Sequence, residues 1–228
     1  MKINSFCQIC SQYQTFESPD DYWSCRSSLK SQKCPYGGCV SRERAVADVL
    51  FRFYPKEQFS NLIIHEAAPC PRGISYWLKS CVPNIQYVRS GYWPNKPSGS
   101  VIGELVNCDL TNQHFDSNLF DIILHLDVLE HIFDPWKALQ ECIRTLKPGG
   151  RMFFTVPIEP GRLKTEQVAF LDGQGEISTI GKPEYHGNPQ RPEDGALVTY
   201  RYGFDLSREI ILRLNCDIEV YSCQSRSK

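Results

Sequence analysis

Four cysteines near the start of the chain have the residue type and spacing of a metal site. Cys7 and Cys10 are separated by two residues, while Cys34 and Cys39 enclose a Pro-Tyr-Gly-Gly turn. Each pair can bend around one ion, and the two glycines supply the tight turn that this bend needs. Four thiolates in a tetrahedral arrangement are sufficient to hold a structural Zn²⁺. The sequence therefore predicts a Cys-rich, zinc-binding segment over residues 1–40.

Alternatives to this zinc site remain open. Cys25 lies between the two pairs and can replace one ligand or be a bystander, and the second pair is spaced more widely than the first. The same cysteines can instead be reduced side chains that pack as small apolar groups. Redox chemistry is disfavoured, because neither pair follows a strand and opens a helix as in thioredoxin-like units. A bound metal is expected to be structural, since the segment has little else to bury.

The elements that could position further chemistry are clearest over residues 109–157. Residues 120–126 form a run that is apolar on both faces, which is typical of a buried parallel strand. Asp134 can cap a helix that Pro135 opens, and a Lys-Pro-Gly-Gly sequence stops it. A second buried strand is predicted over residues 151–156. This is a right-handed βαβ unit of an open α/β sheet, an architecture that binds ligands at its strand ends.

Other segments extend this architecture on both sides. A helix is predicted over residues 41–55, with Ser41 as its cap and with Glu43 and Arg44 on its solvent face. Short apolar runs predict strands over residues 61–66, 85–89 and 105–110, and a final helix and strand over residues 205–214 and 216–223. The predicted domains are therefore residues 1–40 and residues 41–228.

Bulk composition limits the classes of partner. The chain has 228 residues with 25 Lys and Arg against 26 Asp and Glu, a net charge of −1, which argues against nucleic acid as a partner. The polar first residues predict no secretory signal, and no apolar stretch has membrane-spanning length. Eleven cysteines without an export signal favour a reducing compartment. We expect a soluble, cytoplasmic protein.

A family resemblance is carried by residues 120–157. Phe-Asp is followed by Val-Leu-Glu-His, Pro135, Ala-Leu and Leu-Lys-Pro-Gly-Gly, and then by an apolar strand and Val-Pro. This pattern resembles the fourth-to-fifth-strand segment of class I S-adenosylmethionine-dependent methyltransferases. It implies a Rossmann-like, mostly parallel seven-strand-type sheet with helices on both faces. The knuckle, the helix after Ser41 and the late PEYHGNP segment are together similar to bacterial methyltransferases of unassigned substrate.

The resemblance implies that S-adenosylmethionine is the cofactor and that it lies across four strand ends. The residues that it implies as contacts are Glu66, Ala67, Gly73, Ser90, Asp109, Leu110, Leu126 and Asp127. Two departures stand out: the first loop has one glycine where the family has several, and Ser90 stands where an acid usually holds the ribose. Glu66 can instead be a salt-bridged strand end, and Asp109 can be a turn cap.

No catalytic residue is predicted. Asp127, His131, Tyr185 and His186 are candidate bases for an alcohol acceptor. His131 is expected to tie the start of the following helix. A metal is not expected here, because His125 and His131 are six residues apart and do not share one face.

The segment over residues 157–203 is predicted to be an insertion that forms an acceptor-site lid. It is rich in glycine and proline and too long for a plain connection. Arg162, Arg191 and Arg201 can pair with a carboxylate or phosphate of the acceptor, or be incidental surface charges. The sheet's usual C-terminal hairpin is expected to be incomplete, or completed by residues 197–202.

Three functions remain open at this point. The first is methyl transfer to a small-molecule or glycan-type acceptor. The second is RNA methylation with the zinc knuckle as the reader. The third is a catalytically inactive protein that uses the same fold for binding or regulation. The oligomeric state cannot be inferred from these residues.

Overall fold

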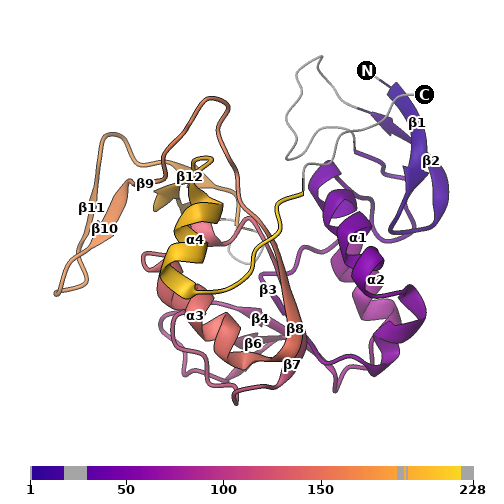
Figure 1. Ribbon diagram of the computed structural model, residues 1–228, viewed down its shortest axis with the longest axis horizontal. Helices are drawn as coiled ribbons and strands as arrows, with labels where there is room; N and C mark the ends of the chain where they lie inside the picture. Colours follow the sequence, from indigo (N-terminus) through magenta and orange to yellow (C-terminus); the bar gives the residue numbers. More distant parts are fainter. Residues whose placement is uncertain (1, 18–29, 189–192, 194, 222–228) are drawn as a thin grey trace.

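A six-stranded sheet forms the centre of the computed structural model, which describes residues 2–17, 30–188, 193 and 195–221 (Figure 1). The strand order is β5-β6-β4-β3-β7-β8, in which β5 alone is antiparallel to its neighbour. The strands are β3 (Ile64–Ala67), β4 (Tyr87–Gly91), β5 (Val101–Ile102), β6 (Leu105–Asn107), β7 (Phe120–Leu126) and β8 (Leu146–Thr155). This order confirms the predicted Rossmann-like fold.

Helices cover both faces of this sheet. α1 (Ser41–Phe53) and α2 (Gly73–Cys81) pack on one face, where Leu50 and Trp77 join one apolar core with Leu124. α3 (Pro135–Thr145) and α4 (Leu206–Leu214) pack on the other face around a second core. Two short 3₁₀ helices, η1 (Lys56–Asn61) and η2 (Leu129–His131), connect these elements.

The helix after the fourth strand begins as predicted. The Asp134 side chain accepts a hydrogen bond from the Lys137 backbone N–H at 3.0 Å, and Pro135 is the first helical residue. Aspartate satisfies a free amide at the helix start, and proline lacks the N–H that would go unpaired there.

The start of α1 differs from the prediction. Val40 is the N-cap, and Glu43 is fully buried. Its Oε2 accepts the Val40 N–H at 3.0 Å, and its Oε1 lies 2.8 Å from Nε of Arg72. The prediction of a Ser41 cap with Glu43 on the solvent face is therefore wrong, because a cation from the loop before α2 allows the carboxylate to be buried. Arg44 also packs inward, 3.9 Å from the centre of the Phe16 ring.

The N-terminal segment shares its core with the sheet. β1 (Lys2–Cys7) and β2 (Gln12–Glu17) form an antiparallel hairpin. Ile9 and Phe16 of this hairpin are buried in the same cluster as Leu50. The expectation that the segment has little to bury is wrong, since the hairpin places apolar side chains against α1.

The insertion folds into three short two-stranded ladders. These pair β10 with β11, β12 with β13, and β14 with β9. The bounds are β9 (Glu166–Gln167), β10 (Ala169–Leu171), β11 (Ile177–Thr179), β12 (Tyr185–His186), β13 (Ala196–Leu197) and β14 (Tyr200–Arg201). Residues 197–202 therefore pair within the insertion and do not complete the central sheet. Arg191 lies outside the described residues.

The last described residues do not form the predicted strand. Over residues 216–221 the backbone makes no ladder, and Tyr221 instead packs edge-on against Phe53, with ring centres 6.4 Å apart. Within the described part of the chain, the central sheet therefore ends at β8. No described helix has both the length and the apolar character that crossing a bilayer requires.

Candidate functional site

The strand order reverses between β3 and β7, and the backbone is unusual at that point. Ala67 pairs with His125 across these strands. The first residues after the two strands, Ala68 and Asp127, both have φ of 52°. This left-handed conformation is uncommon for residues other than glycine, and its cost of about 1–3 kcal/mol tends to be retained at functional sites. Ligands of open α/β sheets bind at such a reversal, so this edge is the candidate site.

Neighbouring strand ends make the edge continuous. Ala67 also pairs with Ser90 of β4, and Gly91 pairs with Asn107 of β6. The ends of β6, β4, β3 and β7 are therefore adjacent. The structure thus brings the predicted cofactor-contact positions to one edge of the sheet, with the exception of Gly73, which opens α2.

Asp127 is fixed by two distant segments at the end of β7. Its Oδ2 accepts a hydrogen bond from Nη1 of Arg42 at 2.8 Å, and its Oδ1 accepts one from Oγ1 of Thr155 at 2.7 Å. Only 7% of the Asp127 side chain is exposed. Both carboxylate oxygens of Asp127 therefore have partners within the protein. The geometry therefore suits orientation of a ligand better than proton abstraction.

Glu66 points beneath the edge, toward α2. Its Oε1 accepts a hydrogen bond from Oγ of Ser75 at 2.6 Å, and its Oε2 accepts one from the Tyr87 hydroxyl. Burial raises the pKa of Glu66 to about 7, although these two hydrogen bonds lower it. The sequence left a salt bridge open as an alternative for Glu66. The structure shows two hydroxyl donors in its place, so the carboxyl group is engaged within the protein.

Gly73 and Ser90 are also engaged within the protein. The Gly73 N–H donates to the carbonyl of Tyr36 at 2.7 Å. Its φ is +59°, and a Cβ at this position would collide with Oε2 of Glu43. Oγ of Ser90 lies 2.8 Å from Nε2 of His65 in the buried core. The cofactor roles of both residues stay predictions, and so does that of Glu66.

Asp109 caps a turn at the end of β6. Its Oδ1 accepts hydrogen bonds from the Thr111 backbone N–H at 2.8 Å and from Oγ1 of Thr111 at 2.7 Å. This is the turn-cap geometry that the sequence left open as an alternative. Leu110 is buried in the core beneath the turn. Contact with the cofactor stays a prediction for both residues.

The insertion docks on η2, directly after Asp127. The backbone N–H of Thr199 donates to the Glu130 carbonyl at 2.7 Å, and the Tyr202 hydroxyl donates to the Leu129 carbonyl at 3.0 Å. Nδ1 of His131 lies 2.8 Å from the Leu197 carbonyl. His131 therefore ties the insertion to η2, whereas we expected it to tie the start of α3.

This docking brings a second histidine to the site. The His186 ring lies edge-on to the His131 ring, with centroids 5.0 Å apart. His125, in contrast, is buried and stacked on Phe154, so it is not the partner of His131. Spacing along the sequence could not reveal the pair, because His131 and His186 meet only through the ladder between β12 and β13.

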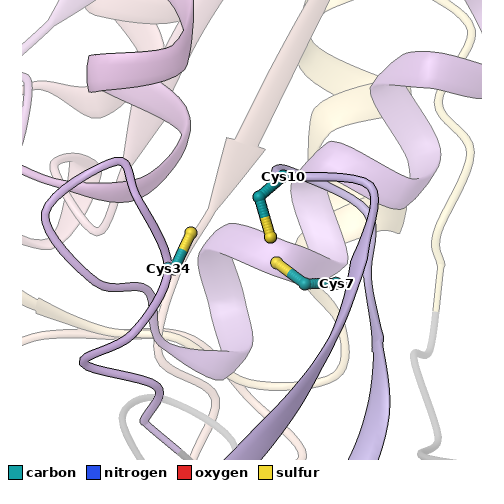
Figure 2. A group of neighbouring side chains, drawn as sticks. All are labelled: Cys7, Cys10 and Cys34. Carbon is teal, nitrogen blue, oxygen red and sulfur yellow. The ribbon is translucent and has the colours of Figure 1, made fainter.

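The predicted zinc ligands gather at the tip of the N-terminal hairpin. The Sγ atoms of Cys7, Cys10 and Cys34 lie within 4.8 Å of one another (Figure 2). Sγ of Cys39 lies 3.9 Å from that of Cys7. Tetrahedral Zn²⁺ with Zn–S bonds of about 2.3 Å would separate its sulfurs by roughly 3.8 Å. The thiols of Cys7, Cys10 and Cys34 therefore fit one such ion, and Cys39 approaches the cluster through Cys7. Cys25 lies outside the described residues.

Charge and backbone support the same cluster. Hydrogen bonds from the Cys34 and Cys7 thiols, together with the nearby Arg44 guanidinium, lower the pKa of Cys39, while the same bond to Cys39 raises the pKa of Cys34. Nζ of Lys56 donates to the carbonyls of Gln8 and Ile9 at 2.6 and 3.0 Å, which holds the turn between Cys7 and Cys10. Thiolates are the form of cysteine that binds metal.

Comparison with known proteins identifies one part of the chain. Residues 84–154 match the family described as "Methyltransferase domain". The ubiquinone biosynthesis O-methyltransferase of Coxiella burnetii (strain Dugway 5J108-111) is 42% identical over 40 residues, which are 18% of this chain and 17% of that protein. The ubiquinone biosynthesis O-methyltransferase of Parvibaculum lavamentivorans is 50% identical over 34 residues, which are 15% of this chain and 13% of that protein. This chain thus aligns with less than a fifth of these relatives' length.

Among solved structures, this chain is similar to an S-adenosylmethionine dependent methyltransferase from Mesorhizobium loti. The two are 14% identical, with a TM-score of 0.44, over 74% of this chain and 80% of that one. A putative sarcosine dimethylglycine methyltransferase from Galdieria sulphuraria is 16% identical, with a TM-score of 0.39, over 54% of this chain and 48% of that one.

Proposed function

We propose that this chain, which carries a class I S-adenosylmethionine-dependent methyltransferase domain, transfers a methyl group to an oxygen of a small-molecule or glycan-type acceptor. The observation that carries the proposal is the pair of left-handed residues, Ala68 and Asp127, at the reversal of strand order. The methyltransferase match over residues 84–154 includes the whole unit from β7 to the end of α3. The names of the matched relatives favour oxygen as the acceptor atom.

Within this edge of the sheet, the ends of β3 and β7 fit the cofactor most directly. Small side chains at Ala67 and Ala68 permit close approach of a ligand to the end of β3. Leu126 and Asp127 lie beside them at the end of β7. S-adenosylmethionine would supply an activated methyl carbon on a sulfonium sulfur. The acceptor oxygen would attack that carbon in line as the methyl–sulfur bond breaks, and its proton would leave to a base.

We also propose a structural Zn²⁺ on Cys7, Cys10, Cys34 and Cys39. The mutual spacing of the Cys7, Cys10 and Cys34 sulfurs and the approach of the Cys39 sulfur to that of Cys7 support it. The ion would fix the loop whose Tyr36 carbonyl binds the first amide of α2. Metal analysis of the purified protein should give one zinc per chain, and Cys10→Ser should lower this content, whereas Cys216→Ser, outside the cluster, should not. An unchanged content in Cys10→Ser would contradict the site.

The internal hydrogen bonds at the ends of β3 and β4 and at the start of α2 favour a second function. Glu66, Gly73 and Ser90 use polar atoms within the protein. A catalytically inactive binding or regulatory protein would tolerate this arrangement without consequence. It would keep the fold and lose measurable affinity for the cofactor.

Calorimetry separates these two functions. We expect S-adenosylmethionine to bind zinc-loaded protein with a stoichiometry of one and a dissociation constant in the micromolar range. Transfer of a labelled methyl group into fractionated small-molecule extract would then identify the acceptor. Absence of binding at millimolar cofactor would reject the enzyme and leave the binding protein.

A further inference from the structure

Two motifs singled out in the sequence meet in the folded chain. Val-Leu-Glu-His contributes Glu130 and His131, and the PEYHGNP segment contributes His186. One ligand atom from each of these side chains lies within 4.8 Å of those of the other two. Glu130 is fully buried, while the side chains of His131 and His186 are 18% and 19% exposed. The cluster lies directly after Asp127, at the carboxyl end of β7.

The hydrogen bonds of each histidine determine which nitrogen faces the carboxylate. Nδ1 of His131 is 2.8 Å from the Leu197 carbonyl, and a carbonyl only accepts, so this nitrogen carries the proton. Nε2 of His186 is 3.3 Å from Oε1 of Glu184, which likewise assigns the proton to that nitrogen. In the neutral rings, Nε2 of His131 and Nδ1 of His186 then present lone pairs.

Both lone pairs face the same oxygen. Nε2 of His131 lies 3.7 Å from Oε1 of Glu130, and Nδ1 of His186 lies 3.8 Å from that oxygen. These separations are too long for a shared proton. An ion bound at about 2.0–2.2 Å from tetrahedral nitrogen and oxygen ligands separates those ligands by roughly 3.3–3.6 Å. The observed spacing is close to this range.

We propose that Glu130, His131 and His186 form a divalent-cation site with open positions for the acceptor oxygen. Two imidazoles and one carboxylate suit first-row divalent ions. A histidine that binds a metal through one nitrogen is oriented by an oxygen that accepts a hydrogen bond from its other nitrogen. Asp127 lies outside the ligand set, because Arg42 and Thr155 hold it. The bound cation lowers the pKa of a hydroxyl acceptor, which then releases its proton to water. This acceptor role rests on the proposed methyl transfer; the metal site itself does not.

Electron paramagnetic resonance with Mn²⁺ tests the site without cofactor or acceptor. Mn²⁺ prefers nitrogen and oxygen ligands and should leave zinc on the thiolates. Zinc-loaded full-length protein should bind one Mn²⁺ per chain at the site. Glu130→Gln and His186→Ala should each weaken this binding at least tenfold. His114→Ala is the matched control, since His114 lies in the loop between β6 and β7 and contacts Ser98 and Phe115. The Mn²⁺ affinity of this variant should equal that of the wild type.

Each outcome decides the proposal. Equal Mn²⁺ affinity in wild type and His186→Ala, or no binding at millimolar Mn²⁺, overturns the site. His186 lies on a partly exposed ladder, so His186→Ala should fold, and its S-adenosylmethionine affinity by calorimetry reports on an intact sheet edge. Mn²⁺ binding that is lost in His186→Ala while wild type fails to bind S-adenosylmethionine supports the metal site and rejects the methyl transfer.

Discussion

The two halves of the sheet edge use their polar groups differently. At the ends of β3 and β4, Glu66 and Ser90 are turned inward to Ser75, Tyr87 and His65. At the end of β7, Asp127 is instead bound by a cation, Arg42, and by the hydroxyl of Thr155. Position at a strand end is thus shared by both halves, but the partners that reach each side chain decide what it can do.

Different segments complete the two halves. The N-terminal segment closes the first, because the Tyr36 carbonyl accepts a hydrogen bond from the Gly73 N–H. The insertion closes the second, through Thr199 on the backbone of Glu130. Perturbing one segment should therefore affect one half more than the other.

Removal of the zinc should give the largest effect, and it should destabilise the first half of the edge more than the second. Because binding free energy of a structural zinc is also folding free energy, chelation should cost up to about 10 kcal/mol of stability in the N-terminal segment. Amide hydrogen exchange should then rise strongly over residues 73–81 and little over residues 135–145. Equal increases in both helices would contradict the division.

Loss of Arg42 should be the next largest effect, and it acts on the second half. Arg42→Met leaves the Asp127 carboxylate buried without this cation, which should lower the free energy of unfolding by about 3–5 kcal/mol. Urea denaturation measures it, and Arg42→Met with Asp127→Asn should cost less than the sum of the single changes. A loss below about 1 kcal/mol would show that the pair does not hold the edge.

The raised pKa of Glu66 predicts a pH dependence of the first half. Its folded pKa of about 7 exceeds its ordinary value of 4.5, so the folded state retains a proton that the unfolded state has lost. Stability from this group is complete below about pH 4.5 and falls as the pH rises through 7. The full loss is on the order of 3 kcal/mol.

Glu66→Gln supplies the test of this pH dependence. Its free energy of unfolding should vary less between pH 5 and about 8 than that of the wild type, because glutamine does not titrate. Parallel curves for the two proteins would show that folding does not raise the pKa of Glu66.

Gly73 tests how tightly the N-terminal segment closes α2. Gly73→Ala should cost about 2 kcal/mol, from its positive φ and from the collision with Glu43, which is buried and bonded to Val40 and Arg72. Gly103→Ala is the matched control: its φ is +60° and no atom lies within 4 Å of the added Cβ, so it should cost about 1 kcal/mol. Equal losses of stability for the two variants in thermal denaturation would show that the collision with Glu43 does not contribute.

Ser90 gives the smallest expected effect. Ser90→Ala removes the hydrogen bond to His65 and should cost about 1 kcal/mol of stability. If its hydroxyl is directed to His65, affinity for S-adenosylmethionine should change less than threefold in calorimetry. A tenfold loss of affinity in a stable variant would instead support the predicted ribose contact.

Local patterns were sufficient for the elements and the family. These patterns depend only on near neighbours: the apolar run at residues 120–126, the cap at Asp134 and the Leu-Lys-Pro-Gly-Gly sequence. The fold and the methyltransferase resemblance that they indicated are confirmed. The carboxyl ends of these strands were correctly expected at one edge, since parallel strands meet there.

Partners distant in sequence could not be predicted in the same way. The burial of Glu43 depends on Arg72, and the inward turn of Ser90 depends on His65, which lies on the neighbouring strand. The meeting of His186 with Glu130 depends on a docked ladder whose strands are two residues long. Periodicity carries no information about such contacts.

Hydrogen exchange with and without S-adenosylmethionine tests the central claim most directly, namely that the cofactor lies across the reversal between β3 and β7. We expect protection of amides at residues 67–70 and 126–129, with a smaller effect at 109–111 and none at 206–214. No protection at millimolar cofactor, or protection confined to residues outside the edge, would contradict the claim.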